Sequence, residues 1–195
     1  IGNTSTASIT FSNNIYNLGG ATTFVASSGD ENFEIAQAVT FTGNAAADNI
    51  TFSTSTIDLQ DGANLTVNSG GGDITIASIM GHSGETVTLN TGGSSGSVSV
   101  GAIGTSNEIG TIGITGTDGI TLSGDITTAD NVANTTVTLT GDVSLGANIT
   151  IDTSSTGDAA ADGNVTFSGK INSDGGTPRN LVVTTDDANI SVTGL

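Results

Sequence analysis

The most frequent local pattern in the chain is a triplet with one polar residue between two apolar residues. Because successive side chains of a strand point to opposite faces, the apolar side chains of a triplet share one face and the threonine or serine occupies the other. The pattern predicts β-strands of about three to five residues each. Such triplets occupy residues 9–11, 39–41, 65–67, 74–76, 87–89, 98–100, 120–122, 137–139, 143–145, 149–151, 165–167 and 190–192.

Strands this short cannot hold a β-sandwich together through hairpins, and the dipeptides that form tight hairpin turns are sparse. A solenoid solves the problem, because each short strand pairs with its equivalents in the coils above and below. Inward Val, Ile, Leu and Phe then form the core, and outward Thr and Ser form ladders on the surface. We therefore predict an all-β fold, a right-handed parallel β-helix (β-solenoid) of about seven to nine coils.

A looser similarity, with a period of about a hundred residues, also covers the chain. The recurring stretches are 1–5 with 103–107, 49–56 with 148–156, and 61–67 with 162–167. We interpret residues 1–195 as one continuous solenoid, with a first repeat module at 1–102 and a second at 103–195. Residues 191–195 resemble 99–102, so two copies joined end to end would recreate the junction between modules. We expect copies of the chain, or adjacent repeats, to stack head to tail.

Composition agrees with many short strands. Thr, Val, Ile and Gly dominate, and 29 glycines stand against a single proline, which favours numerous tight turns. No cysteine is present, so no disulfide framework exists. No apolar run approaches the length of a transmembrane helix, and we find no signal peptide.

The formal net charge is −17, with 19 acidic residues against Lys170 and Arg179. Nucleic acid and anionic lipid headgroups need basic residues to neutralise phosphate. The charge therefore argues against a nucleic-acid partner and against binding to anionic lipid headgroups, and the lack of a long apolar run argues against membrane insertion. It favours solubility, with loose binding of divalent cations as the alternative.

Polar residues at strand starts predict turns. Gly-Asp pairs open strands at 72–73, 124–125 and 141–142, where we expect Gly to adopt positive φ and Asp to bond its own backbone. Asparagines that precede strands also indicate turns. They match the glycosylation sequon as well, but a chain rich in Asn and Thr produces this match by chance. These residues are Asn49, Asn64, Asn148, Asn164 and Asn189. Residues 92–96 are expected to form a projecting loop, and residues 44–48 and 158–162 a matching pair of loops.

Six of the seven aromatic residues fall within the first 52 residues: Phe11, Tyr16, Phe24, Phe33, Phe41 and Phe52. The alternation around Phe11, Phe41 and Phe52 places them with Ile and Val. We therefore predict that they fill the core of the first coils. An exposed strip that stacks on carbohydrate is the alternative.

The whole chain resembles a known family in its composition. The stretches 163–171, 180–183 and 188–194 are similar to the β-strand repeats of filamentous-haemagglutinin-like adhesins and autotransporter passengers. That resemblance implies a right-handed parallel β-helix on a bacterial surface, serving adhesion, cell contact or matrix building. No functional residue of the family has a position here to which it can be transferred.

Candidate catalytic residues are few. His82 is the single histidine and stands beside Ser83, but adjacency in sequence does not provide the geometry of a nucleophile and its base. Paired carboxylates could hydrolyse a glycoside, and Asp186 and Asp187 are the only two adjacent aspartates. A polysaccharide lyase would need more cations than Lys170 and Arg179. We therefore expect no enzyme and no catalytic, cofactor-binding or metal-binding residues.

Two binding alternatives remain. Calcium could lie at turn aspartates stacked on successive coils, although residues 70–74 miss the tandem spacing of a calcium-binding β-roll. Ice binding would need a flat, regular threonine array, for which residues 136–140 are the best stretch; unequal coil lengths argue against a lattice match.

The favoured function is structural. We predict a segment of an extracellular, cell-surface fibre or giant exoprotein, acting as a rigid stalk, sheath or filament that continues beyond both ends. The alternative is an adhesin module whose projecting loops bind a glycan or protein receptor.

Overall fold

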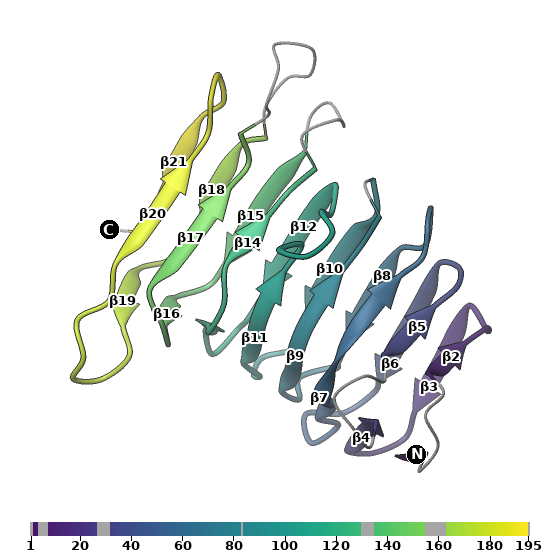
Figure 1. Cartoon of the computed structure of the whole chain (residues 1–195). Helices are drawn as coiled ribbons and strands as arrows, with labels where there is room; N and C mark the ends of the chain where they lie inside the picture. Colours follow the sequence, from purple (N-terminus) through teal and green to yellow (C-terminus); the bar gives the residue numbers. More distant parts are fainter. Residues whose placement is uncertain are drawn as a thin grey trace.

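The computed structural model describes residues 2–3, 8–26, 32–82, 84–129, 135–154 and 163–194. Over these ranges the chain forms strands and turns without any helix, and it winds into a parallel β-solenoid of about seven turns (Figure 1). Every pairing between the described strands is parallel, either within a 13-stranded or within an 8-stranded sheet. The predicted fold class is confirmed.

Three faces surround the core. The first face contains the start of β7 (Ile50–Leu59), β9 (Ile74–Met80) and β11 (Val98–Ile103), together with β1 (Gly2–Asn3), β4 (Thr22–Ala26), β13 (Ile120–Leu122), β16 (Val143–Leu145) and β19 (Ile171–Ser173). The second contains the ends of β7, β9 and β11, together with β2 (Ile9–Phe11), β5 (Phe33–Ile35), β14 (Ile126–Thr127), β17 (Ile149–Asp152) and β20 (Leu181–Thr184).

The third face is the 8-stranded sheet, whereas the first two faces together make the 13-stranded sheet. Its strands are β3 (Ile15–Leu18), β6 (Val39–Gly43), β8 (Leu65–Asn68), β10 (Thr86–Asn90), β12 (Thr111–Thr115), β15 (Thr136–Thr140), β18 (Val165–Phe167) and β21 (Ile190–Val192). Hydrogen-bonded positions in neighbouring coils are 22 residues apart between Asn64 and Thr86 but 32 apart between Asn148 and Asn180. The unequal lengths are taken up at the corners.

Three strands are longer than predicted: β7 has ten residues, β9 seven and β11 six. The prediction was wrong here because the chain turns from the first face to the second without leaving the sheet. In β7 the bend is at Thr54, which has a φ of 69°, and the pairing with β9 shifts register between Phe52 and Thr56.

The single coil is the unit of repetition. Leu65 and Val165 lie four coils apart in one ladder of the third face, as the similarity of their surroundings suggested. Ile50 and Ile149 do not correspond in this way, because Ile50 lies on the first face and Ile149 on the second. The division into two modules at residues 102 and 103 stays a prediction, and β11 runs through both positions.

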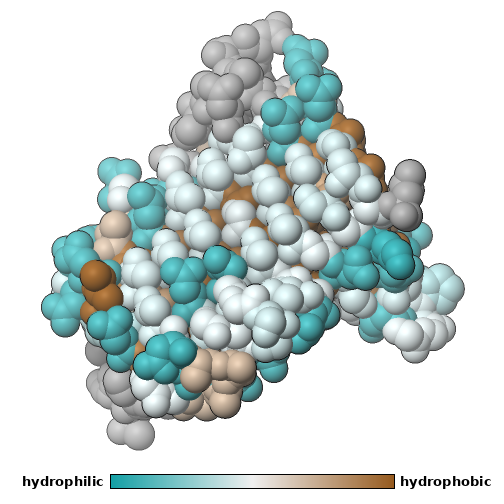
Figure 2. All heavy atoms as spheres, turned by 180° about the vertical axis from the view of Figure 1, so that it is seen from behind, coloured by the Kyte–Doolittle hydropathy of each residue, from teal (hydrophilic) through white to brown (hydrophobic). Residues whose placement is uncertain are grey.

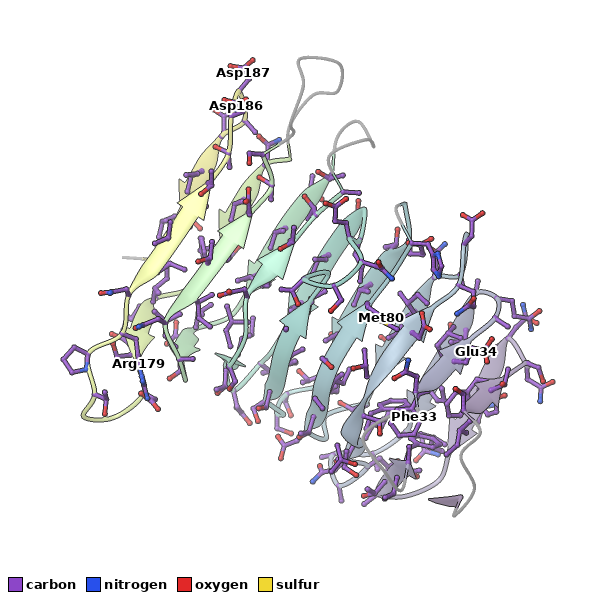
Figure 3. The ribbon with its side chains drawn as sticks, viewed as in Figure 1. Phe33, Glu34, Met80, Arg179, Asp186 and Asp187 are labelled. Atoms are coloured by element: carbon purple, nitrogen blue, oxygen red, sulfur yellow. The ribbon has the colours of Figure 1, made fainter. Side chains whose placement is uncertain are left out.

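The core is one continuous column of inward side chains. The phenylalanines of the first coils form an edge-to-face and stacked cluster, in which the rings of Phe24 and Phe52 lie 4.7 Å apart. Their predicted role as core fillers is confirmed; Phe33 is among the fully buried ones (Figure 3). Tyr16 is half-buried and stacks on Phe41 with 5.1 Å between ring centres.

The last coil leaves apolar side chains uncovered. Ile190 and Val192 pair in register with Val165 and Phe167, which are buried, yet they are 49% and 42% exposed. Their positions therefore face the column of the core, and no further described coil packs against them.

Candidate functional site

Side chains of asparagine and aspartate form ladders at the starts of strands. Asn49 Oδ1 accepts a hydrogen bond from the backbone N–H of Asp73, one coil on, at 2.8 Å. Asp73 Oδ1 in turn accepts from the N–H of Ser97 at 2.8 Å. In five further pairs a side-chain oxygen accepts a hydrogen bond from the backbone N–H one coil on. The acceptor and donor residues are Asn64 and Thr86, Asp125 and Thr150, Asp142 and Lys170, Asn148 and Asn180, and Asn164 and Asn189. The side chains thus join coils, which corrects the expectation that they bond their own turns.

The glycines of the Gly-Asp pairs also differ from expectation. Gly141 has a positive φ of 128°, but Gly72 and Gly124 do not. A Cβ on Gly72 would lie 2.6 Å from the carbonyl carbon of Asp48, and one on Gly124 would lie 2.4 Å from the nitrogen of Ala102. Glycine is needed at these two positions because the backbones of adjacent coils approach closely.

Residues 92–96 do not project. Gly71 N–H donates to the carbonyl of Thr91, and Ser95 Oγ donates to the carbonyl of Gly71 at 2.9 Å, so the segment packs on the preceding coil. Residues 44–48 form a turn in which the buried Asp48 accepts bonds from the N–H groups of Asn44 and Ala45. The predicted partner loop, 158–162, lies outside the described residues.

His82 is exposed and its neighbour Ser83 lies outside the described residues. The N–H of His82 donates to Oε2 of the fully buried Glu85 at 2.8 Å, and Glu85 Oε1 accepts from Gly62 N–H at 3.1 Å. Glu85 therefore anchors this corner to the preceding coil. An open hollow of about 300 Å³ beside His82 is lined by Gly104, Thr105, Ser106, Asn107, Glu108 and Thr127.

The other candidate residues are separated. Asp186 and Asp187 lie at the tip of one corner of the last coil, and Arg179 lies toward its opposite end (Figure 3). Arg179 Nε forms an ion pair with Asp174 Oδ1 at 3.3 Å. Lys170 is exposed and its backbone N–H bonds Asp142. The structure therefore does not bring the acidic pair and the two cations together.

Sequence reasoning missed one cluster. Glu34 and Asp58 pair in register on the second face, and Met80 follows on the next coil (Figure 3). Burial raises the pKa of Asp58 and the charge of Glu34 raises it further, whereas His82, Gln60 and Asn32 act in the opposite direction. One carboxylate oxygen of Asp58 is buried without a hydrogen-bond partner. The triplets 33–35 and 57–59 could have indicated this cluster, because each has an acidic residue between two apolar residues.

The described residues contain no group of three or more His, Cys, Asp or Glu side chains that could hold a metal ion. Asp73 and Asp142 lie on the first face, three coils apart, and Asp125 lies at the start of the second face. A shallow hollow of about 230 Å³ contains two carboxylates, Asp118 and Asp142. Each already accepts a backbone hydrogen bond from a neighbouring coil.

The third face carries a regular field of threonines. Its described strands keep one register from β3 to β21, because every change in coil length falls outside them. Unequal coil lengths therefore do not disturb this array, which corrects the argument made against a lattice match.

Comparison with known proteins places the chain in no group. No family model, no curated protein and no solved structure matches it. None of the described residues forms a helix that could span a membrane. The fold itself defines the class, a β-solenoid repeat protein, and this class fits a structural or adhesive module.

Proposed function

We propose that the chain is a segment of an extracellular fibre or large surface protein, in which it acts as a rigid stalk or filament. The observation that carries the proposal is the uncovered last coil. Ile190 and Val192 hold core positions but are half exposed, and the strand edges of β19, β20 and β21 have no partner on their outer side among the described strands. A further coil stacked there would complete both the core and the hydrogen-bond ladders.

Other features support a mechanical role. Backbone hydrogen bonds run along the axis through both sheets, and the asparagine and aspartate ladders add further bonds in the same direction. The acidic surface, with a net charge of −17, opposes lateral association of rods by repulsion. Axial bonding with lateral repulsion favours long, separate filaments.

A tandem fusion of two copies of residues 1–195 tests the stacking. We expect its thermal midpoint to exceed that of the single chain, and we expect residues 190–192 of the first copy to gain protection from hydrogen exchange. The double variant Ile190→Lys and Val192→Lys in the first copy should abolish both effects, because it places charge in the joined core. Equal midpoints and unprotected residues at the junction would argue against continuation of the solenoid.

Location is tested separately on the source cells. Antibodies against the third face should label intact cells or shed filaments in electron micrographs. The mass of the denatured polypeptide then distinguishes stacked subunits of about this length from a much larger chain with covalent repeats. Labelling only after permeabilisation would refute the extracellular role while leaving the stacking result unaffected.

A further inference from the structure

The third face is free of charge in a strongly acidic chain. None of its described strands contains a charged residue, although the chain has 19 acidic residues. On the six strands from β6 to β18 most outward positions are threonine: Thr40, Thr42, Thr66, Asn68, Thr86, Thr88, Asn90, Thr111, Gly113, Thr115, Thr136, Thr138, Thr140 and Thr166. At the two ends of the sheet Ile15, Asn17 and Ser191 hold the equivalent positions. The described strands of this face therefore present hydroxyl and methyl groups and no charged side chain.

These residues form rows across the strands. The central row consists of Thr40, Thr66, Thr88, Gly113, Thr138 and Thr166 on six consecutive strands of the sheet. One flanking row is Thr86, Thr111 and Thr136, and the other is Thr42, Asn68, Asn90, Thr115 and Thr140. The field is therefore periodic in two directions.

The array is also rigid and flat. Neighbours in a row are about 4.8 Å apart, and neighbours along one strand are about 6.6 Å apart, which is twice the rise per residue of a parallel strand. Threonine is branched at Cβ, so few rotamers are open to it, and all but one of these threonines are half-buried between their neighbours. Figure 2 shows this side of the molecule as a nearly level field of side chains of intermediate hydropathy, uncovered by loops over most of its area.

The two-dimensional regularity of the face favours a crystalline partner. Water oxygens on the prism face of hexagonal ice repeat in two directions at distances of this order, whereas a protein or soluble glycan receptor offers no such extended lattice. Hydroxyl groups can join the outermost water layer, the methyl groups between them order adjacent water, and no ion is present to disrupt that order. We propose that the third face binds the surface of ice. Because the array is already rigid, binding loses little side-chain entropy.

Ice-affinity partition of the full chain tests the proposal, with growth arrest of single ice crystals as a second readout. We expect the wild type to be enriched in slowly growing ice relative to an acidic reference protein. The double variant Thr88→Lys and Thr138→Lys should fall to the level of that reference. The matched control Thr75→Lys and Thr121→Lys carries the same charges on outward positions of the first face and should retain enrichment.

Gly113 allows a test in the opposite direction. It interrupts the central row, and a Cβ there would meet no atom within 4 Å. Gly113→Thr completes the row and should raise both enrichment and growth arrest above the wild type. If the lysine variants fail to fold by circular dichroism, Thr88→Val with Thr138→Val replaces each hydroxyl group by a methyl group of similar size and should lower enrichment.

Three results would overturn the proposal. The first is exclusion of the wild type from ice to the same extent as the reference protein. The second is equal loss of enrichment in the third-face and first-face lysine variants. The third is retention on microcrystalline cellulose or chitin without enrichment in ice, which would assign the face to a crystalline polysaccharide.

Discussion

At the scale of single residues, side chains that precede strands decide how neighbouring coils are joined. Asn49, Asp73 and Asn164 each accept the N–H of the equivalent residue one coil on. That N–H belongs to a residue just before a strand, where the adjacent coil's backbone does not supply the acceptor. Asparagine and aspartate fit the position because their side chains are short and carry an acceptor oxygen.

Replacing Asn164 by Ala should lower the free energy of unfolding by about 1 kcal/mol, because the N–H of Asn189 loses its acceptor at 2.9 Å. Asn164→Asp keeps an acceptor oxygen and should retain most of the stability. Asn172→Ala, at an exposed outward position of β19, serves as the control. Urea unfolding measures all three, and equal losses in Asn164→Ala and Asn172→Ala would contradict this role.

Asp58 predicts a pH-dependent change in stability. Its pKa is raised by burial and by Glu34, so the folded state binds this proton more tightly than the unfolded chain. Stability from this group is complete below the ordinary pKa of Asp and is lost as pH rises through the raised value. Asp58→Asn should therefore stabilise the protein at neutral pH, by at most about 1 kcal/mol for a partly exposed group, and give no gain in acid.

The control is Asp61→Asn, which removes the same charge from an exposed turn three residues away. Thermal midpoints between acid and neutral pH provide the measurement. A gain from Asp58→Asn that persists unchanged in acid, or an equal gain from Asp61→Asn, would show that general repulsion and not the site near Glu34 and His82 is responsible.

At the scale of elements, the corners between the first two faces restrict which residues the chain can carry there. β9 and β11 turn these corners without a loop, and their backbones come close there. A Cβ on Gly101 would lie 1.9 Å from the carbonyl oxygen of Ala77. In the middle of the third face the situation is reversed, since Gly113 has open space around it.

Gly101→Ala should therefore destabilise the protein by about 3 kcal/mol or more, because the backbone of one coil must move. Gly113→Ala should be neutral or stabilising by up to about 1 kcal/mol, because glycine weakens a strand interior. Thermal unfolding of the two variants compares the same chemical change at both positions. Similar midpoints for the two would contradict the close approach of β9 and β11.

Strands were predictable from sequence because alternation of side chains is a local property; residues 137–139 and 149–151 became strands as expected. Pairing between coils was less accessible, since it depends on the lengths of the corners. Residues 50 and 149 look alike but lie on different faces for that reason. The pairing of Glu34 with Asp58 likewise depends on the length of the coil between them, which cannot be read directly from the sequence.

At the scale of the whole molecule, the charge of −17 and the axial bonds act against each other. Folding concentrates carboxylates along the rod, so screening should favour the folded state. The Debye length falls from about 10 Å at 0.1 M salt to about 3 Å at 1 M.

We expect the thermal midpoint to rise with sodium chloride over this range. Calcium chloride at matched ionic strength should have a similar effect, because no three carboxylates of the described residues gather around one point. Midpoints that fall or stay constant with salt would contradict the role of repulsion. A much larger rise with calcium than with sodium would instead indicate a specific site at the turn aspartates.

Freedom at the corners has an evolutionary consequence. Two hydrogen-bonded positions in adjacent coils are separated by 22 residues in one place and 32 in another, yet the sheets continue without interruption. Insertions at the segment 174–180, in the longest of these coils, should thus leave the rod intact. A protein of this kind can acquire a new recognition peptide at one corner, while the strand pairing and the peptides at its other corners stay unchanged.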